Sequence, residues 1–268
     1  AVTKQEIMMR LLPVAAAYAR PAISRFPVGA VAMGQPVAGL PDNLGHLYLG
    51  ASYEFSGQTL TFTVHAEQSA TNNAWLHGET GLQFLSVTAA PCGYCRQFLY
   101  EIATARKGFA ILLSNPDAEP PYSEITLAAL LPNAFGPQDL GKQAALMQPQ
   151  HHRLKHPDSS QLVQQTLAAA NQSYAPYSGN YAAVGLMLKD ETIVVGRNAK
   201  NAAFNPSLSP LESAVSQLNL LRAPQVRLEI SAALLIEAES VVSQHEVTMD
   251  GLSAVAPGVR LRHIVVKP

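Results

Sequence analysis

Residues 64–70 read Val-His-Ala-Glu-Gln-Ser-Ala, and residues 91–95 read Pro-Cys-Gly-Tyr-Cys. His65, Cys92 and Cys95 offer one nitrogen and two sulfurs, a donor set that suits tetrahedral zinc and leaves its fourth position for water. Glu67 is then a carboxylate beside the metal that is not needed as a ligand. Hydrolysis at a metal requires such a group to move protons, so this stretch predicts a catalytic zinc site.

The segments that carry these residues are predicted to be helices. A helix over residues 65–76 places His65 and Glu67 in its first turn, and a helix over residues 92–103 does the same for both cysteines. The amino end of a helix favours negative charge, which helps to hold the carboxylate and the thiolates ionised. The two helix ends are therefore expected to face each other across the metal.

Hydrophobic patterns around these helices predict an α/β domain in the first half of the chain. The order is helix, two strands, helix, strand, helix, strand, which is typical of a three-layer α/β/α fold. Besides the two helices above, the expected elements are a helix at 7–20 that Pro13 kinks or divides, strands at 28–33, 47–51, 82–87 and 109–113, and a short helix at 127–131.

The second half repeats this pattern in degraded form, with a helix at 161–173 and strands at 183–188, 192–197, 231–237 and 260–266. Residues 210–214 are aligned with residues 65–69, which puts Pro210 in the place of the histidine. This half has no cysteine, so it is predicted to keep the scaffold and to lose the metal. Glu212 is interpreted as a relic or a surface residue rather than a catalytic acid.

We therefore predict a zinc-binding catalytic domain at residues 1–131, an extended linker at 132–159 and a degenerate, non-catalytic copy at 160–268. The linker is rich in Pro, Gln, His and Lys and lacks periodicity. His151, His152 and His156 lie in it. They admit a second metal site, but no cysteine or carboxylate pair accompanies them at ligand spacing, which favours a polar connector.

Composition limits the class of protein. The 268 residues are 48 % hydrophobic, and 18 Lys and Arg balance 19 Asp and Glu. A near-neutral chain without a basic run argues against a nucleic acid partner. No apolar run approaches the roughly 20 residues of a membrane span. Both cysteines lie in the zinc motif, which excludes a disulfide framework and suits a reducing compartment. A cytoplasmic protein is expected.

The motif Cys92-x-x-Cys95 admits two other interpretations. A thioredoxin-like redox pair leaves the His-x-Glu motif unexplained. A structural zinc site would take a fourth ligand from a histidine such as His46 or His77. The combination of His-x-Glu with Pro-Cys-x-x-Cys is more restrictive than either half, and it is the signature of zinc deaminases that act on bases.

With these motifs the chain resembles the long, homodimeric bacterial type of cytidine deaminase over nearly its whole length. The resemblance implies a three-layer fold duplicated into one active zinc domain and one zinc-free copy per subunit, one zinc ion per subunit and a small nucleoside substrate. Further matching stretches are Leu11-Leu12-Pro13-Val14-Ala15-Ala16-Ala17, Gly50-Ala51 with Glu54-Phe55, Cys95-Arg96-Gln97-Phe98, Ala134-Phe135-Gly136-Pro137 and Asn201-Ala202-Ala203-Phe204-Asn205-Pro206.

By this resemblance the chain hydrolyses cytidine and 2'-deoxycytidine to uridine and 2'-deoxyuridine plus ammonia, in pyrimidine salvage. Zinc on His65, Cys92 and Cys95 activates water. Glu67 moves its proton to N3 of cytosine while hydroxide attacks C4, and later supplies a proton to the departing amine. The backbone around Ala66 meets the edge of the base.

The resemblance also assigns substrate contacts. Phe26 stacks on the base, although core packing is its alternative, and Glu54 binds a ribose hydroxyl. At Ser52 the family usually has asparagine; serine is shorter and lacks the paired geometry of an amide, which puts the sugar contacts in doubt. Phe204 and Asn205 are expected to border a partner subunit's pocket.

Two alternative functions stay open at this point. One is deamination of a related nucleotide or of cytosine in a polynucleotide, which needs a basic groove and stacking aromatics; the aromatic content is 7 %. The other is a non-catalytic, zinc-stabilised binding protein. Replacing Glu67 with glutamine distinguishes the second alternative from an enzyme: a binding protein keeps its function, whereas an enzyme loses turnover with zinc still bound.

Overall fold

The structure, a computed structural model, describes residues 2–106, 108–224, 226 and 229–267. It divides into two compact units, each built from three stretches of the chain. Unit 1 comprises Ala1–Tyr53, Val64–Gln148 and Asn201–Pro206, and unit 2 comprises Glu54–Thr63, Pro149–Lys200 and Ser207–Pro268. Each half of the sequence thus gives a short segment to the unit formed mainly by the other half. The linear domain boundaries expected above stay a prediction.

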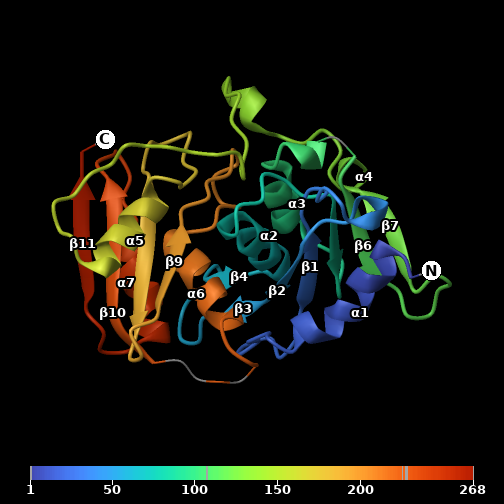
Figure 1. Cartoon of the computed structure of the whole chain (residues 1–268), viewed down its shortest axis with the longest axis horizontal. Coiled ribbons are helices and arrows are strands. Elements are labelled where there is room, and N and C mark those ends of the chain that lie inside the picture. Colours follow the sequence, from blue (N-terminus) through green and yellow to red (C-terminus); the bar gives the residue numbers. More distant parts are fainter. Residues whose placement is uncertain (1, 107, 225, 227–228, 268) are drawn as a thin grey trace. The chain divides into compact units, whose positions relative to one another are not determined.

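Unit 1 is built on a five-stranded sheet in the order β2-β1-β5-β6-β7 (Figure 1). β1 is antiparallel to β2 and to β5, while β5 and β6 run parallel. The predicted strands are present, and β7 is an addition at the sheet edge. The bounds are β1 Gly29–Met33, β2 Leu47–Ala51, β5 Phe84–Val87, β6 Ala110–Ser114 and β7 Tyr122–Thr126.

Helices cover both faces of this sheet, which confirms the α/β layering. The helix α1 (Lys4–Ala16) packs on one face by burying Met8 and Leu12 against Val31 and Met33 of β1. It runs without a break through Pro13. The helix α2 (Ala66–Leu76) lies against β2 and β1 on the other face (Figure 1).

Shorter elements complete unit 1. The helix α3 (Gly93–Tyr100) follows β5 along the chain, and α4 (Leu127–Leu130) follows β7. Two short strands, β3 (Tyr53–Glu54) and β4 (Thr63–Val64), pair with each other at the point where the chain passes between units. The 3-10 turns are η1 (Pro41–Asn43), η2 (Thr104–Arg106) and η3 (Pro137–Leu140).

Unit 2 repeats the core of unit 1. Its sheet has the order β11-β10-β8-β9, with antiparallel β8–β9 and β8–β10 pairs and a parallel β10–β11 pair. These are the relations among β6, β5, β1 and β2, so the predicted duplication is confirmed. The bounds are α5 Gln161–Ala170, β8 Ala182–Leu188, β9 Ile193–Arg197, α6 Pro210–Leu220, β10 Ile230–Ala238, α7 His245–Val255 and β11 Leu261–Val266.

Two glycines fix the register of the repeat. A Cβ on Gly50 would lie 2.1 Å from the nitrogen of Ala70 and 2.5 Å from the carbonyl oxygen of Ala66. A Cβ on Gly196 would lie 2.1 Å from the nitrogen of Ala214 and 2.4 Å from the carbonyl oxygen of Pro210. In both units the helix backbone therefore rests directly on the strand.

This contact makes Pro210 the counterpart of Ala66. The expected alignment of Pro210 with His65 is wrong by one residue, and the true counterpart of His65 is Ser209, since each is the N-cap of its helix. Leu211 then stands where Glu67 stands. Sequence letters alone favoured matching Glu212 to Glu67, but the glycine contact sets the register.

Within the described ranges, no helix combines the length and apolarity that crossing a bilayer demands.

Candidate active site

Two helix N-termini bring the predicted zinc ligands together. His65 is the N-cap of α2 and Cys92 the N-cap of α3, while Cys95 lies in the first turn of α3. The ligand atoms of these residues all lie within 4.8 Å of one another. The expectation that two helix ends meet at the metal is confirmed.

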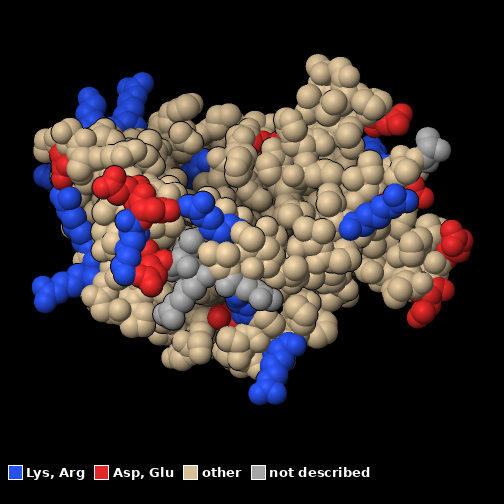
Figure 2. Space-filling view, turned by 60° about the horizontal axis from the view of Figure 1, so that its bottom comes forward, with Lys and Arg blue, Asp and Glu red and all other residues tan. Residues whose placement is uncertain are grey.

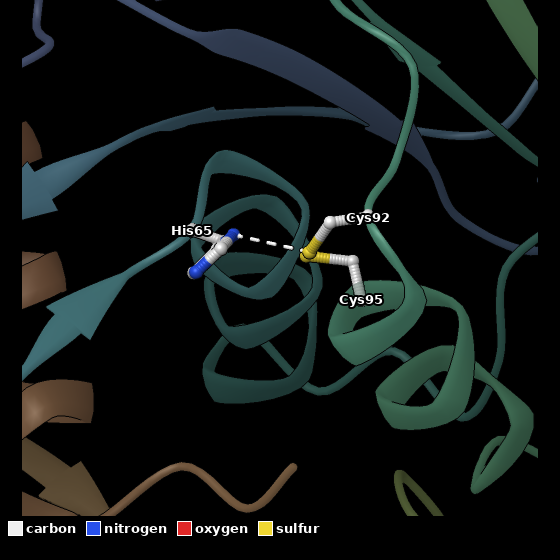
Figure 3. Close-up of side chains that lie close together, drawn as sticks. All are labelled: His65, Cys92 and Cys95. Atoms are coloured by element: carbon white, nitrogen blue, oxygen red, sulfur yellow. Dashed lines mark hydrogen bonds between the residues drawn. The ribbon is translucent and has the colours of Figure 1, made fainter. Parts of the chain in front are cut away.

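The distances between the ligand atoms match tetrahedral zinc. Zn–S bonds of about 2.3 Å and Zn–N bonds of about 2.0–2.1 Å at the tetrahedral angle place two sulfurs about 3.8 Å apart and a sulfur and a nitrogen about 3.6 Å apart. Cys92 Sγ lies 3.7 Å from Cys95 Sγ and 3.6 Å from His65 Nδ1, and Figure 3 shows the sulfurs of both cysteines on the side facing the imidazole. The donor set therefore fits zinc in type and in geometry.

The two cysteines differ in exposure and acidity. Cys92 is exposed and Cys95 is buried. Hydrogen bonds with Cys95 and His65 lower the pKa of the Cys92 thiol to about 3. The hydrogen bond with Cys92, together with burial, raises the pKa of Cys95. Cys92 is thus the thiol that gives up its proton first, and the thiolate is the form that ligates a metal.

Glu67 is placed beside this ligand cluster, in the first turn of α2. Only 4 % of the residue is exposed. Burial raises the pKa of its carboxyl, against opposing effects of its own backbone N–H, of His65 and of a hydrogen bond with Cys95. Burial thus makes the Glu67 carboxylate a stronger base than an exposed one, which suits a group that accepts a proton and passes it on.

The ring and backbone of His65 have two further partners. The ring of Tyr94 stacks on its imidazole at a centroid distance of 5.4 Å and an interplanar angle of 20°. The backbone N–H of His65 donates to Gln68 Oε1 at 3.2 Å. Tyr94 lies between the two cysteines in the sequence, but that position alone predicts no role for it.

The alternative fourth ligands do not join the cluster. His77 caps the far end of α2, about 18 Å along the helix axis from His65. His46 is paired with Glu79, and its Nδ1 lies 3.7 Å from a Glu79 oxygen. In the part of the chain that is described, the metal-binding group consists of one histidine and two cysteines, so a closed structural zinc site is not supported.

The linker histidines have other contacts. His152 stacks on Tyr181 with ring centroids 3.4 Å apart, and its Nε2 lies 2.8 Å from the carbonyl oxygen of Ser173. Burial lowers the pKa of His152. Among the described residues the three linker histidines form no metal-binding group.

Unit 2 has different residues at the corresponding helix ends. Ser209 stands at the position of His65 and Leu211 at that of Glu67. Gln244 is the N-cap of α7, which is the counterpart of α3. Its side chain donates to Asn180 Oδ1 at 3.1 Å. An amide contact thus occupies the place that Cys92 has in unit 1.

The predicted substrate-contact residues lie in distinct environments. Phe26 is 61 % exposed, so the core-packing alternative is wrong. Ala66 is buried as the first residue of α2. Ser52 is buried, and its hydroxyl accepts a hydrogen bond from the Val28 N–H at 3.2 Å. Glu54 lies on β3, is half-buried and belongs to unit 2.

Comparison with known proteins assigns the chain to a family with a zinc-binding region. A family model described as the cytidine and deoxycytidylate deaminase zinc-binding region matches residues 2–110, and a second model of that description matches residues 127–249. A cytidine deaminase of Shewanella woodyi is 44 % identical over 266 residues, which is 99 % of this chain and 84 % of the relative. The chain belongs to the cytidine deaminase family.

Other cytidine deaminases extend the comparison. The protein of Photobacterium profundum is 39 % identical over 98 % of this chain and 84 % of its own length. A solved cytidine deaminase from Mycobacterium tuberculosis is 27 % identical, covers 50 % of this chain and 98 % of its own, and has a TM-score of 0.39. Both halves of this chain match the zinc-binding region of the cytidine deaminase family, yet the ligand set lies in unit 1.

Proposed function

We propose that this chain hydrolyses cytidine and 2'-deoxycytidine to uridine and 2'-deoxyuridine with release of ammonia. One observation carries the proposal: a buried carboxyl, Glu67, lies in the first turn of the helix that His65 caps, beside a three-ligand group that leaves one tetrahedral position for a reactant. The relatives named above are cytidine deaminases, and the match covers 84 % of the length of each. Zinc on the three ligands supplies a Lewis acid that activates water near neutral pH.

In this mechanism Glu67 carries the protons. Its carboxylate accepts a proton from the attacking water and transfers it to N3 of cytosine while the C4–O bond forms. It then takes the second proton from the oxygen now bonded to C4 and delivers it to the amino group; the C4–N bond breaks, C4 becomes a carbonyl, and ammonia leaves. The raised pKa of Glu67 supports both roles, because burial makes its carboxylate a stronger base than an exposed glutamate.

Contacts to the nucleoside are proposed as follows. The backbone at Ala66, beside Glu67, meets the edge of the base, and the exposed ring of Phe26 stacks on its face. Glu54 accepts a hydrogen bond from a ribose hydroxyl. The Ser52 oxygen already accepts the Val28 N–H, so its O–H donor and its second lone pair remain for the sugar.

The assembly and setting are proposals as well. The subunit forms a homodimer in which Phe204 and Asn205 border the partner's pocket, and Phe204 is 63 % exposed on the subunit, as such a contact requires. The protein works in the cytoplasm in pyrimidine salvage. Its only two cysteines are the two thiolate ligands, which need a reducing compartment.

A polynucleotide substrate is the less favoured alternative. Residues other than Lys, Arg, Asp and Glu (tan) occupy most of the face drawn in Figure 2, and both acidic and basic side chains lie on it. Lys and Arg number 18 against 19 Asp and Glu. Tracking a phosphate backbone needs a continuous basic groove, so a small nucleoside is favoured.

The test is an ultraviolet assay of the zinc-loaded full chain with cytidine, 2'-deoxycytidine and cytidine monophosphate. Loss of absorbance with the free nucleosides, together with stoichiometric ammonia, is the expected result. No change with either nucleoside would overturn the proposal. Turnover of the monophosphate alone would assign the site to nucleotides.

A further inference from the structure

The segment Asn201–Pro206 comes from the second half of the sequence but packs within unit 1, which also holds the zinc ligands. It is hydrogen-bonded to the helix α3 and to the C-cap residue of that helix. Because α3 begins after Cys92 and carries Cys95, this segment touches the element that positions both thiolates.

Two residues of the α3 region hold the segment. The Gln97 side chain donates to Asn201 Oδ1 at 3.3 Å and to the Phe135 carbonyl at 2.7 Å, and Asn201 Nδ2 donates to the Gln97 carbonyl at 2.9 Å. Glu101 accepts a hydrogen bond from the Ala202 N–H at 3.0 Å. Glu101, Asn201 and Ala202 are each at most 3 % exposed, so these bonds are made away from water.

The backbone of Glu101 fastens other segments to the same helix end. Its carbonyl oxygen accepts hydrogen bonds from the Leu146 N–H at 3.0 Å and from Arg106 Nη2 at 3.2 Å. Its side chain is buried, and a buried polar group is costly unless it is hydrogen-bonded. Glu101 therefore joins the end of α3 to Arg106 nearby and to two distant parts of the chain, at Leu146 and at Ala202.

We propose that Glu101 is a positioning residue for the zinc centre and acts through α3 and the segment Asn201–Pro206. Glu101 lies about 9 Å along the helix axis from Cys95. A short helix held at both ends moves as one body, so release of its C-terminal end displaces Cys95 relative to His65, which belongs to a different helix. Partners behind a metal's ligands set ligand orientation in this way.

The inference rests on the proposed function for its kinetic readout, whereas its spectroscopic readout needs only metal binding. The full chain with Glu101→Ala, and separately with Glu101→Gln, is loaded with Co²⁺, whose visible absorption reports ligand geometry. The alanine variant is expected to shift these bands, to lose metal to a chelator faster, and to lower kcat for cytidine about 10- to 100-fold with KM little changed.

Glu101→Gln is expected to restore the wild-type cobalt spectrum and most of kcat, because the amide oxygen still accepts the Ala202 N–H. The matched control is Glu124→Ala, on an exposed position of β7, and it is expected to match the wild type in every measurement. If Glu101→Ala does not fold, the variant Gln97→Leu is used in its place, because it removes the side-chain hydrogen bonds of Gln97 to Asn201 and Phe135.

An unchanged cobalt spectrum in a folded Glu101→Ala chain would overturn the inference, even if the melting temperature fell, because the contact would then serve stability alone. Failure of Glu101→Gln to restore the spectrum would also overturn it. A third outcome separates the two proposals. If the wild-type chain does not turn over cytidine, the proposed function is overturned; if the cobalt bands of Glu101→Ala still differ from those of the wild type, the positioning role is supported.

Discussion

Gln68 and Glu212 hold the same position in two helices of different units. Each is the third residue of its helix, and each accepts a hydrogen bond from the backbone N–H of the N-cap residue. His65 donates to Gln68 Oε1 at 3.2 Å, and Ser209 donates to Glu212 Oε2 at 2.8 Å. Glu212 is therefore a capping residue, and the counterpart of Glu67 in unit 2 is a leucine.

The different roles of Glu67 and Glu212 can be tested by experiment. Glu67→Gln is expected to lower cytidine turnover by about 10²- to 10⁴-fold, because the amide cannot accept the proton, while zinc stays bound. Glu212→Gln is the matched control; its amide oxygen keeps the cap, so turnover is expected to stay at the wild-type level. Turnover and zinc content are measured on the same samples. Near-normal turnover of zinc-loaded Glu67→Gln would show that another group carries the proton.

Removal of zinc is expected to abolish activity and to expose both cysteine thiols to chemical modification. Dialysis against a strong chelator is expected to abolish turnover and to make both cysteines reactive towards a thiol reagent, because each is a ligand. Added zinc is expected to restore activity and to protect the thiols. Full activity in a chain shown by metal analysis to hold no zinc would contradict the assignment.

The glycine contacts predict matched stability losses. Gly50→Ala and Gly196→Ala each place a methyl group 2.1 Å from a helix nitrogen, so each is expected to cost about 1–3 kcal/mol or more in the free energy of unfolding. Gly93→Ala, where nothing lies within 4 Å of the added carbon, is the control and is expected to be neutral or mildly stabilising. Denaturant midpoints of the three variants give the comparison. Equal stability of Gly50→Ala and Gly93→Ala would refute the contact.

Acid should weaken unit 2 through Glu237. Burial acts to raise the pKa of this carboxyl, but hydrogen bonds from Ser243, Asn180, Gln244 and His263 outweigh it, and the pKa is lowered. Folding therefore favours the ionised form. The contribution is complete well above the unfolded value of 4.5 and is lost as the pH falls through the lower folded value.

The measurement for Glu237 is a series of urea midpoints between neutral pH and about pH 3, a range that spans the usual pKa of a glutamate. Glu237→Gln is expected to lower stability at neutral pH and to flatten its decline in acid. Glu239→Gln, at an exposed neighbouring position, is expected to follow the wild-type curve. Parallel curves for the wild type and Glu237→Gln would contradict the assignment.

The strands and helices with regular apolar spacing could be predicted from sequence, as β1 and β2 illustrate. β7 was missed because its residues are largely exposed, with Tyr122 and Ile125 only partly buried. The helix α7 was missed because it buries just Thr248, Gly251 and Leu252, which leaves little apolar periodicity. Both elements are held by their neighbours in the fold rather than by a pattern of their own.

The zinc ligands and Glu67 could be identified because their chemistry needs particular residue types at short spacing. The role of Glu101 could not, because the hydrogen bond that it accepts comes from a residue far along the chain, Ala202. The one-residue error at Pro210 has a similar origin. Residue identity favoured aligning Glu212 with Glu67. The backbone contact of Gly196 shows that Pro210 is instead the counterpart of Ala66.

The exchange of short segments between the two units bears on how this chain can be dissected. A gene cut between the halves would deprive the zinc-binding unit of Asn201–Pro206 and the other unit of Glu54–Thr63. No single peptide bond separates two complete bodies. A unit expressed from one uninterrupted half of the sequence would therefore lack a segment of its own and would carry a segment that belongs to the other unit.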